Sequence, residues 1–421
     1  MQINLRTFLA PGQTFPNDDA TDAGPLFQTA VNAIESLFTV PVQLIVATGR
    51  YRMTTQVTWK TRAGIVGAGQ GRTVLLPYGE VTALKRQSED GDADGYLEDC
   101  RFIDFTIDGI NQTSTPSNSL VKGIFLAFVR RIRLTRLEVK NSWMTGFGID
   151  YADGAVIESC IARNAGRGTT NTLTAGAGFG FALGKSARNQ YLVRNCESYD
   201  NQTFGFFTED KFGVNPNAEL YSLGFIMEGC TARGNYSGFA DTGCREALVS
   251  GCNFSDNRAY GIYLGKTGAN TSSGVEGRIS DTICSRNGLD GVHLAEVAGV
   301  NDGGYTLEGI QAADNVRHGV HRVTPGGAVI DVLHSITPRR SRIFRNGGSG
   351  VRVASNSVVT RLVISDSDIY NNGTDAGQTY RNGITLLGPT EFLTIAGNRI
   401  YDSRTTGKTQ RYGIAAYDAK A

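Results

Sequence analysis

Apolar residues along most of this chain occur in short runs separated by turn residues, and not at helical spacing. The runs share one phrase, in which an Asn and a short turn are followed by a Gly and an apolar residue. Asn257-Arg-Ala-Tyr-Gly261-Ile-Tyr and Asn287-Gly-Leu-Asp-Gly291-Val-His show the phrase most clearly. It recurs at intervals of roughly 20 to 35 residues, the period of a solenoid repeat. Because each repeat contains strands and turns, the pattern predicts a β-solenoid. Further copies begin at Asn201, Asn235, Asn315 and Asn346.

The repeated Asn and Gly each have a physical use in such a repeat. Asn tolerates left-handed backbone at a corner, and stacked Asn side chains can form an amide ladder along the axis. Gly offers a permissive backbone before the apolar residue that turns inward. We therefore expect the Asn residues to lie at one corner of every rung and the Gly residues to open one strand.

The N-terminal segment has a different pattern. Apolar residues from Leu26 to Leu37 recur at helical spacing and predict a helix from about Pro25 to Phe38, with Asp22 and Pro25 at its start. The open end of a solenoid exposes apolar side chains and unpaired backbone, which such a helix can cover. The sequence thus predicts two parts: a lead-in with a capping helix at 1–41 and a solenoid at 42–421.

The predicted rungs differ in length after the Gly-led strand. Extra residues lie at about 209–219, 266–276, 296–304 and 322–328. Insertions at one corner of successive rungs stack into a wall. A wall beside a flat sheet forms a groove, which suits an extended polymer better than a compact ligand. The Gly residues that open the later rungs are Gly148, Gly180, Gly205, Gly238, Gly261, Gly291, Gly319, Gly350, Gly383 and Gly413.

Composition narrows the class of protein. The formal net charge of +1 disfavours nucleic acid as a partner. No apolar run reaches the length of a membrane span, and Met-Gln-Ile-Asn-Leu-Arg at the N-terminus lacks the features of a signal peptide. The seven cysteines are not spaced as a disulfide framework. Cys196, Cys230 and Cys252 each precede a repeated Asn by the same interval, so they predict one column of stacked free thiols.

The pattern resembles the right-handed parallel β-helix proteins of the pectate-lyase superfamily. The segment from Asp18 to Ile34, the stretches Ala47-Thr-Gly-Arg-Tyr51 and Ile65-Val-Gly-Ala-Gly69, and the repeats from Phe147 onward carry this resemblance. It implies an all-β fold: a right-handed, single-stranded parallel β-helix (solenoid) with a short N-terminal helical cap. The superfamily contains many different activities, so the resemblance does not by itself imply a reaction.

Two groups within that superfamily are most similar. Mannuronan C5-epimerases carry Tyr-Gly-Phe-Asp-Pro-His on an early rung, where this chain has Phe147-Gly-Ile-Asp-Tyr-Ala152. Only Gly148 and Asp150 match, and the phenol and imidazole of the epimerase motif are missing. The chain also resembles bacteriophage tailspikes and tail-associated depolymerases. That resemblance implies a virion or extracellular location, a homotrimer, a bacterial surface polysaccharide as partner and other phage tail proteins as neighbours.

Acidic residues on two consecutive predicted rungs are the candidate catalytic groups. Glu209 and Asp210 follow Gly205, and Asp241 follows Gly238. Two carboxyls about 5 to 9 Å apart can share the roles of acid and base or nucleophile in glycoside hydrolysis. Crowding of like charges would keep one of them protonated. The alternative is that they are ordinary solvated turn acids.

A second column, two residues after each Gly, contains polar and aromatic side chains. If this column faces outward, it forms a stripe suited to sugar binding. A metal site is not predicted, because a third close ligand is not assured beside the two histidines, and no cofactor is inferred. In a uronate lyase, Lys211, Lys266, Tyr263 or His293 would instead act as the base. The predicted substrate-binding residues are Asp150, Lys211, Tyr263, Lys266, His293 and His321.

The sequence therefore predicts a tailspike-like protein that binds a bacterial surface polysaccharide and depolymerises it. Two alternatives remain open. One is a structural or adhesive tail protein that binds glycan without cleaving it. The other is a uronate polysaccharide lyase or epimerase.

Overall fold

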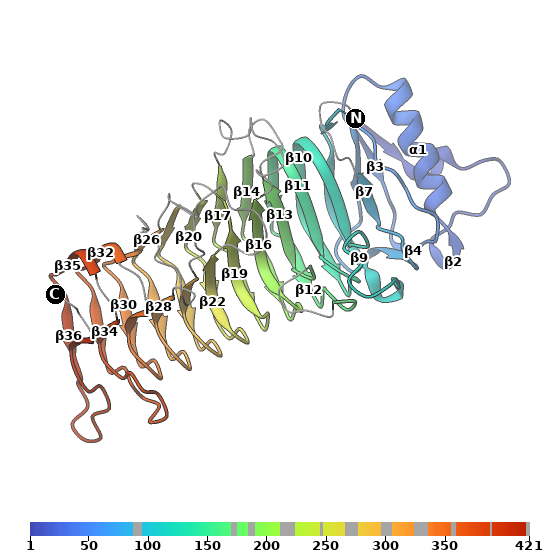
Figure 1. The fold of residues 1–421 in the computed structure, drawn as a ribbon. Helices are drawn as coiled ribbons and strands as arrows, with labels where there is room; N and C mark the ends of the chain where they lie inside the picture. Colours follow the sequence, from blue (N-terminus) through green and yellow to red (C-terminus); the bar gives the residue numbers. More distant parts are fainter. Residues whose placement is uncertain are drawn as a thin grey trace. The chain divides into compact units, whose positions relative to one another are not determined.

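The fold is a parallel β-helix with a single α-helix, as far as the described residues show (Figure 1). The computed structural model describes residues 1–86, 95–169, 175–183, 190–210, 224–244, 247–265, 277–295, 305–323, 336–354, 359–387 and 390–417. Every strand pairing with a defined register in these ranges is parallel, for example β10 with β11 and β25 with β28. This agrees with the predicted solenoid.

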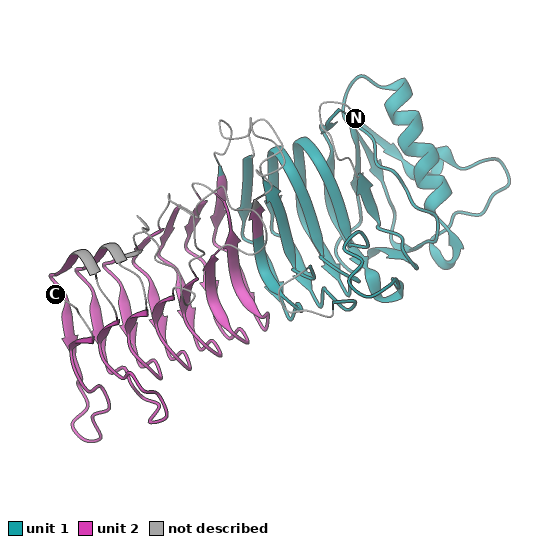
Figure 2. Ribbon diagram, in the orientation of Figure 1, with its two compact units in different colours: residues 1–207, 217–224 teal, residues 208–216, 225–421 magenta. Residues whose placement is uncertain are grey.

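The chain divides into two compact units (Figure 2). Unit 1 comprises residues 1–207 and 217–224, and unit 2 comprises residues 208–216 and 225–421. The division falls within strand β16 (Phe204–Asp210). The boundary between a cap at 1–41 and a β-helix at 42–421 is a different kind of division and stays a prediction.

Unit 1 contains the α-helix α1 (Gly24–Leu37) and the first strands. Two short 3-10 helices, η1 (Leu5–Phe8) and η2 (Gly109–Asn111), lie in the same unit. Its strands are β1 (Gln2–Asn4), β2 (Asp18–Asp22), β3 (Val42–Ile45), β4 (Gly49–Met53), β5 (Ala63–Val66), β6 (Thr73–Pro77), β7 (Leu84–Arg86), β8 (Leu97–Glu98), β9 (Arg101–Asp108), β10 (Ile124–Lys140), β11 (Phe147–Glu158), β12 (Ile161–Arg163), β13 (Phe179–Leu183), β14 (Gln190–Arg194) and β15 (Glu197–Tyr199).

The capping helix forms where its apolar spacing predicts it. Phe27, Val31 and Ile34 are wholly buried, whereas Leu37 is 73% exposed and lies outside the apolar face. The carboxylate of Asp22 accepts a hydrogen bond from the backbone N–H of Gly24 at the start of the helix. The lead-in is not merely extended chain, because β1 pairs with β3 and β2 pairs with β4.

Unit 2 repeats three short strands in each rung. Equivalent strands of successive rungs pair in register, as in β22–β25–β28–β31–β34. Its strands are β17 (Phe225–Glu228), β18 (Thr231–Arg233), β19 (Ser237–Thr242), β20 (Ala247–Ser250), β21 (Asn253–Phe254), β22 (Tyr260–Gly265), β23 (Gly277–Ser280), β24 (Ile283–Ser285), β25 (Val292–Ala295), β26 (Tyr305–Glu308), β27 (Gln311–Ala313), β28 (Val320–Val323), β29 (Ile336–Arg339), β30 (Arg342–Phe344), β31 (Val351–Ala354), β32 (Val359–Ser365), β33 (Asp368–Tyr370), β34 (Ile384–Leu387), β35 (Thr390–Ala396), β36 (Arg399–Tyr401) and β37 (Ile414–Tyr417).

The predicted amide ladder is present in unit 2. The side-chain nitrogen of Asn257 donates to the side-chain oxygen Oδ1 of Asn287 at 3.2 Å, and the side-chain nitrogen of Asn287 donates to Oδ1 of Asn315 at 3.0 Å. The same bond links Asn235 to Asn257, Asn315 to Asn346 and Asn346 to Asn372. The left-handed backbone is not at these residues, contrary to the expectation. It lies one position earlier, for example at Asp256 and Arg286, so that the Asn side chain can turn into the interior.

The repeated Gly is required for space and not for its backbone freedom. None of the Gly residues that open the unit 2 strands has a positive φ. A Cβ built on Gly291 would lie 2.6 Å from the carbonyl oxygen of Gly319 and 2.8 Å from the side-chain nitrogen of Asn315. The next rung and the amide ladder therefore pass too close to admit a side chain. The predicted position of Gly is confirmed, but the predicted reason is wrong.

The seven cysteines are free and buried, as predicted. In unit 2 the backbone N–H of Cys230 points to the sulfur of Cys252, 3.4 Å away. Burial and the neighbouring sulfur raise the pKa of the Cys252 thiol, which is therefore protonated at neutral pH. These thiols act as small apolar fillers.

Candidate functional site

One face of unit 2 carries a column of polar and aromatic residues in strict register. Tyr263 pairs with His293, His293 pairs with His321, and His321 pairs with Arg352. The neighbouring positions Val292 and Val320 are at most 1% exposed and belong to the core. Because successive side chains of a strand point to opposite faces, the column lies on the outer face. The column predicted two residues after each repeated Gly is therefore present in this part of the chain.

The side chains in this column stack on one another. The ring of His293 lies 4.4 Å from that of Tyr260, with 22° between their planes, and 5.7 Å from that of Tyr263. The two tyrosines are only partly buried. Burial raises the pKa of both phenols, which therefore remain protonated at neutral pH. With the buried ring of His293, the two partly exposed tyrosines form an aromatic strip, defined here as Tyr260, Tyr263 and His293.

A fully buried carboxylate, Asp290, organises the groups beneath the strip. Its Oδ2 lies 2.8 Å from Nδ1 of His293 and 3.0 Å from Nδ1 of His321. Arg317 donates to both carboxylate oxygens, and the backbone N–H of His318 donates to Oδ1. Burial alone would raise the pKa of Asp290, but the hydrogen bonds from His293 and His321 outweigh it and hold the pKa well below its ordinary value.

The two deeper histidines are neutral at pH 7. Burial lowers the pKa of His321 to about 4, although its hydrogen bond with Asp290 acts in the opposite direction. Burial and the neighbouring His321 lower the pKa of His318 to about 3. Nδ1 of His318 accepts a hydrogen bond from the backbone N–H of Ser349. Nε2 of His321, in contrast, is buried without a hydrogen-bond partner.

The three predicted catalytic carboxyls occupy unequal positions. Asp241 is wholly buried and pairs in register with Leu264, so it points to the core and not to a surface groove. Its oxygens accept hydrogen bonds from Thr208, Tyr305 and the backbone of Gly243 and Cys244. Burial raises the pKa of Asp241, although these four hydrogen bonds act to lower it.

Glu209 is partly exposed, and Asp210 ends strand β16. The assignment of Glu209, Asp210 and Asp241 to catalysis stays a prediction. The interior position of Asp241 favours a structural role for that residue.

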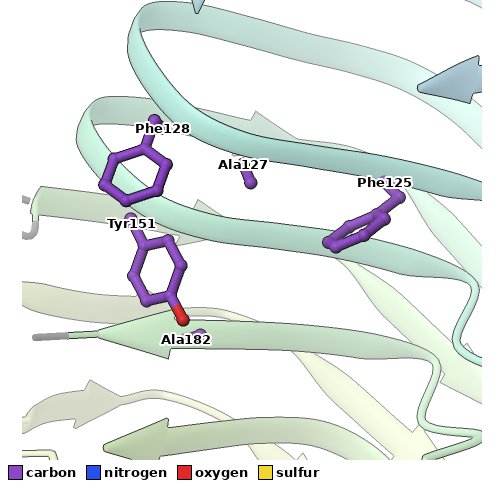
Figure 3. Close-up of a cluster of buried hydrophobic side chains, with 5 residues drawn as sticks. All are labelled: Phe125, Ala127, Phe128, Tyr151 and Ala182. Atoms are coloured by element: carbon purple, nitrogen blue, oxygen red, sulfur yellow. The ribbon is translucent and has the colours of Figure 1, made fainter. Parts of the chain in front are cut away.

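Asp150 lies in unit 1, in the same column as Ala127 and Ala182. These two alanines belong to an apolar cluster that also contains Phe125, Phe128 and Tyr151, outside the core of the β-helix (Figure 3). Nζ of Lys122 lies 3.8 Å from Oδ2 of Asp150 and 3.8 Å from the centre of the Phe125 ring. Asp150 is thus an ion-paired carboxylate beside a buried apolar cluster. Its role in substrate binding stays a prediction.

Several predicted features lie outside the described residues. These are Lys211, Lys266 and most of the four predicted insertions. Their roles in substrate binding, and the groove wall built from them, stay predictions.

Three residues of the site were missed from the sequence. Asp290 and Tyr260 lie inside the repeated turn phrase, where they read as ordinary turn residues, and Arg317 follows the next repeated Asn. Asp290 and Arg317 come from turn segments and Tyr260 begins strand β22, and only the stacking of rungs brings the three together. One signal was available, since Asp290 precedes Gly291 by one residue and His293 follows it by two. Aligned rungs place such residues at adjacent positions.

The chain belongs to the right-handed β-helix family. The family model described as a right-handed β-helix region matches residues 89–274 and 225–421. This match confirms the predicted fold class, including its handedness. No curated protein matches the sequence. Among the described residues, no helix has the length and apolar character needed to cross a membrane.

Solved structures with the same fold include enzymes and phage proteins. The A-module of the mannuronan C-5 epimerase AlgE4 from Azotobacter vinelandii is 19% identical, with a TM-score of 0.54 over 95% of this chain and 98% of that one. Tailspike protein 3 of bacteriophage CBA120 is 13% identical, with a TM-score of 0.59 over 100% of this chain and 61% of that one. The catalytic domain of a GH87 α-1,3-glucanase is 12% identical, with a TM-score of 0.58 over 97% and 70%. At these identities the likeness concerns the fold.

Proposed function

We propose that this protein binds a bacterial surface polysaccharide along the outer face of unit 2 and depolymerises it, as a tailspike-like protein. The observation that supports this most is the aromatic strip, in which the partly exposed Tyr260 and Tyr263 stack on the buried ring of His293. Aromatic faces with polar tips suit sugar rings, which present both C–H surfaces and hydroxyl groups. Rungs about 4.8 Å apart repeat such contacts along a chain molecule.

The similar solved structures are consistent with this proposal. One is a phage tailspike, and another is a glucanase described in complex with tetrasaccharides. Both proteins have the fold that this chain shares, although a fold alone does not specify a reaction. The proposal therefore rests on the strip, and the fold makes it reasonable.

For the reaction we propose glycoside hydrolysis, with Glu209 and Asp210 as the acid and base or nucleophile. Glu209 is partly exposed and follows the buried Thr208, so it is on the outer side of its strand. We assign Asp241 to holding Thr208 and the segment Gly243–Cys244 in place. Hydrolysis by two carboxyls needs both to reach the glycosidic bond.

The burial of Asp241 also favours a second candidate, a protein that binds glycan without cleaving it. In that case the strip would provide affinity, and Glu209 would be a solvated surface residue. The two candidates differ in whether the length of the bound polysaccharide changes.

The deciding experiment incubates the protein with a panel of capsular and cell-wall polysaccharides, followed by sizing and by pull-down of the intact polymer. We expect one polysaccharide to bind and to be shortened. Tyr260→Ala and Tyr263→Ala should each weaken binding at least about tenfold, because each removes a stacking surface. Tyr370→Ala is the matched control, since Tyr370 stacks on Phe344 and Tyr401 in a different column.

Binding without shortening would support the adhesive protein and reject the hydrolase. Equal loss of binding in Tyr370→Ala and Tyr260→Ala would reject the strip as the site. If a polysaccharide is shortened, Glu209→Gln should lower the rate at least about a hundredfold, as loss of a general acid or base does.

A further inference from the structure

The cluster beneath the strip brings together a set of atoms that is typical of a metal site. Asp290, His293 and His321 each offer one donor atom, and these three atoms lie within 4.8 Å of one another. The donors come from a turn and two successive strands, β25 and β28, so only the stacked rungs bring them together. All three residues are buried.

We propose that Asp290, His293 and His321 bind one divalent transition-metal ion through Oδ2 of the carboxylate and Nδ1 of each imidazole. Two imidazole nitrogens and one carboxylate oxygen suit zinc, copper, nickel or iron, whereas magnesium and calcium prefer oxygen ligands. Three protein ligands leave a further position for water or an oxygen of a ligand. This inference does not depend on the proposed polysaccharide activity.

The surroundings hold the carboxylate in the orientation that such a site needs. Nε of Arg317 lies 3.0 Å from Oδ1 of Asp290, and the backbone N–H of His318 lies 3.1 Å from the same oxygen. These two bonds fix Oδ1 and turn Oδ2 toward both imidazoles. Groups that hydrogen-bond to the other oxygen of a metal-binding carboxylate orient the carboxylate and tune its affinity for the ion.

The contacts of His321 provide a second and independent observation. Its side chain is 4% exposed, and among the described residues its one side-chain hydrogen bond is that from Nδ1 to Asp290. Nδ1 of His318, an imidazole just as deeply buried, accepts a hydrogen bond from the backbone N–H of Ser349. Burying a polar group with an unmet bonding capacity costs stability. Because Nε2 of His321 makes no hydrogen bond among the described residues, the ring can carry its proton there without breaking one, which leaves Nδ1 able to bind an ion.

Proton positions distinguish the ion-bound form from the alternative, a cluster held by hydrogen bonds alone. Without an ion, each Nδ1 carries the proton that it donates to Oδ2. On binding, Nδ1 of each neutral imidazole gives its lone pair to the ion, and the proton of each ring is carried on Nε2. The bond from Nη2 of Arg317 to Oδ2 competes with the ion, whereas its bond to Oδ1 can remain.

The experiment uses tag-free full-length protein, stripped with a chelator and titrated with zinc chloride by calorimetry, with metal analysis of the dialysed complex. We expect one ion per chain. His293→Ala and His321→Ala should each weaken binding at least about tenfold, by analogy with the loss of groups that support a metal site. His318→Ala is the matched control, because it keeps the backbone N–H on Asp290 but removes a neighbouring imidazole. Circular dichroism establishes that each variant is folded.

Selective ¹⁵N-histidine labelling provides a readout that needs no variant, since the chain has four histidines. Zinc should shift the Nδ1 and Nε2 resonances of two of them strongly. Absence of saturable binding, unchanged histidine resonances, or parent-like zinc affinity in His293→Ala would each overturn the proposal and leave the hydrogen-bonded cluster. If His318→Ala weakens zinc binding as much as His293→Ala does, the assignment of Asp290, His293 and His321 as the ligands is also rejected.

Discussion

Two buried carboxyls in unit 2 show how strongly the surroundings of a residue decide its chemistry. Asp290 accepts bonds from imidazole and guanidinium groups, and its pKa lies well below the ordinary value. Asp241 accepts bonds only from hydroxyl and backbone donors, and burial raises its pKa. The first is ionised beside cations and neutral rings, and the second lies in a region without a cation among its bonded partners. Their positions in the sequence, just before or after a repeated Gly, do not reveal this difference.

Asp241 allows a sharp test of a structural against a catalytic role. In Asp241→Asn the amide oxygen can keep the three bonds to Oδ1, and the amide nitrogen can donate to the oxygen of Tyr305. We expect a melting temperature close to that of the parent. Asp241→Ala removes four buried hydrogen bonds and should cost about 3 kcal/mol or more. Thermal unfolding of the two variants checks the difference.

The same pair of variants tests catalysis once a polysaccharide substrate is known. A structural Asp241 predicts near-parental cleavage by Asp241→Asn. A fall of a hundredfold in a stably folded Asp241→Asn variant would instead restore Asp241 to the catalytic set.

Asp402 should make the turn after β36 sensitive to acid. Burial raises its pKa, but Arg404 and the backbone N–H groups of Arg404 and Gln410 outweigh burial and lower it to about 2. A carboxyl whose folded pKa is lowered stabilises the fold above its unfolded pKa of roughly 4, and this stabilisation is lost as the pH falls through about 2.

Hydrogen exchange of the Thr409 and Gln410 amides, both bonded to Asp402, should therefore accelerate between these pH values after correction for intrinsic rates. Asp402→Asn should remove this pH dependence. An unchanged profile in the variant would show that another group is responsible.

At the scale of an element, the amide ladder and the Gly-led strand form one structural unit. The side chain of each ladder Asn bonds to the next Asn, and it lies against the Gly that opens the neighbouring strand. This explains why Asn and Gly recur together. The small residue creates the space that the amide occupies, and the amide satisfies backbone groups that the turn leaves unpaired.

Asn287 is the residue whose removal tests the ladder. It accepts hydrogen bonds from the backbone and side chain of Asn257 and donates to Phe254 and Asn315. Asn287→Ala should cost about 2 to 5 kcal/mol, because Asn257, Phe254 and Asn315 all lose buried hydrogen bonds to this side chain. The exposed Asn253 is the control, and Asn253→Ala should change stability by no more than about 0.5 kcal/mol. If urea unfolding shows the same loss of stability in Asn287→Ala and Asn253→Ala, the stabilising role of the ladder is refuted.

At the scale of the whole molecule, a β-helix stabilises each rung mainly by the rungs on either side. Nearly all pairing in each unit is between equivalent strands of neighbouring rungs. Circular dichroism should accordingly be dominated by β-structure with a small helical part from α1. Stability in such a molecule is close to a sum of rung and interface contributions, so unfolding in stages is the natural expectation.

The homotrimer expected from the sequence remains a prediction that a mass measurement can test. Light scattering coupled to size exclusion should give three times the mass of one chain, 45.2 kDa. A mass equal to one chain over a wide concentration range would refute the trimer. It would leave the proposed glycan site of unit 2 untouched, because that strip lies within one unit.

The sequence by itself determined the architecture of this protein. The period of the Asn and Gly positions, the helix near the N-terminus, the free thiols and the column of Tyr263, His293 and His321 all follow from it. They could be predicted because a solenoid repeats one local structure in every rung, so that aligning the rungs places residues in columns.

Only the tertiary structure decided which way a side chain faces and what lies beside it. Asp241 turned out to be a core residue because its strand register places it opposite Leu264. Asp290, Tyr260 and Arg317 joined the site because two turns and the start of strand β22, from different rungs, meet there. A repeat phrase specifies the turn but not the direction of each residue within it. That direction depends on the packing of the neighbouring rungs, which no single stretch of sequence contains.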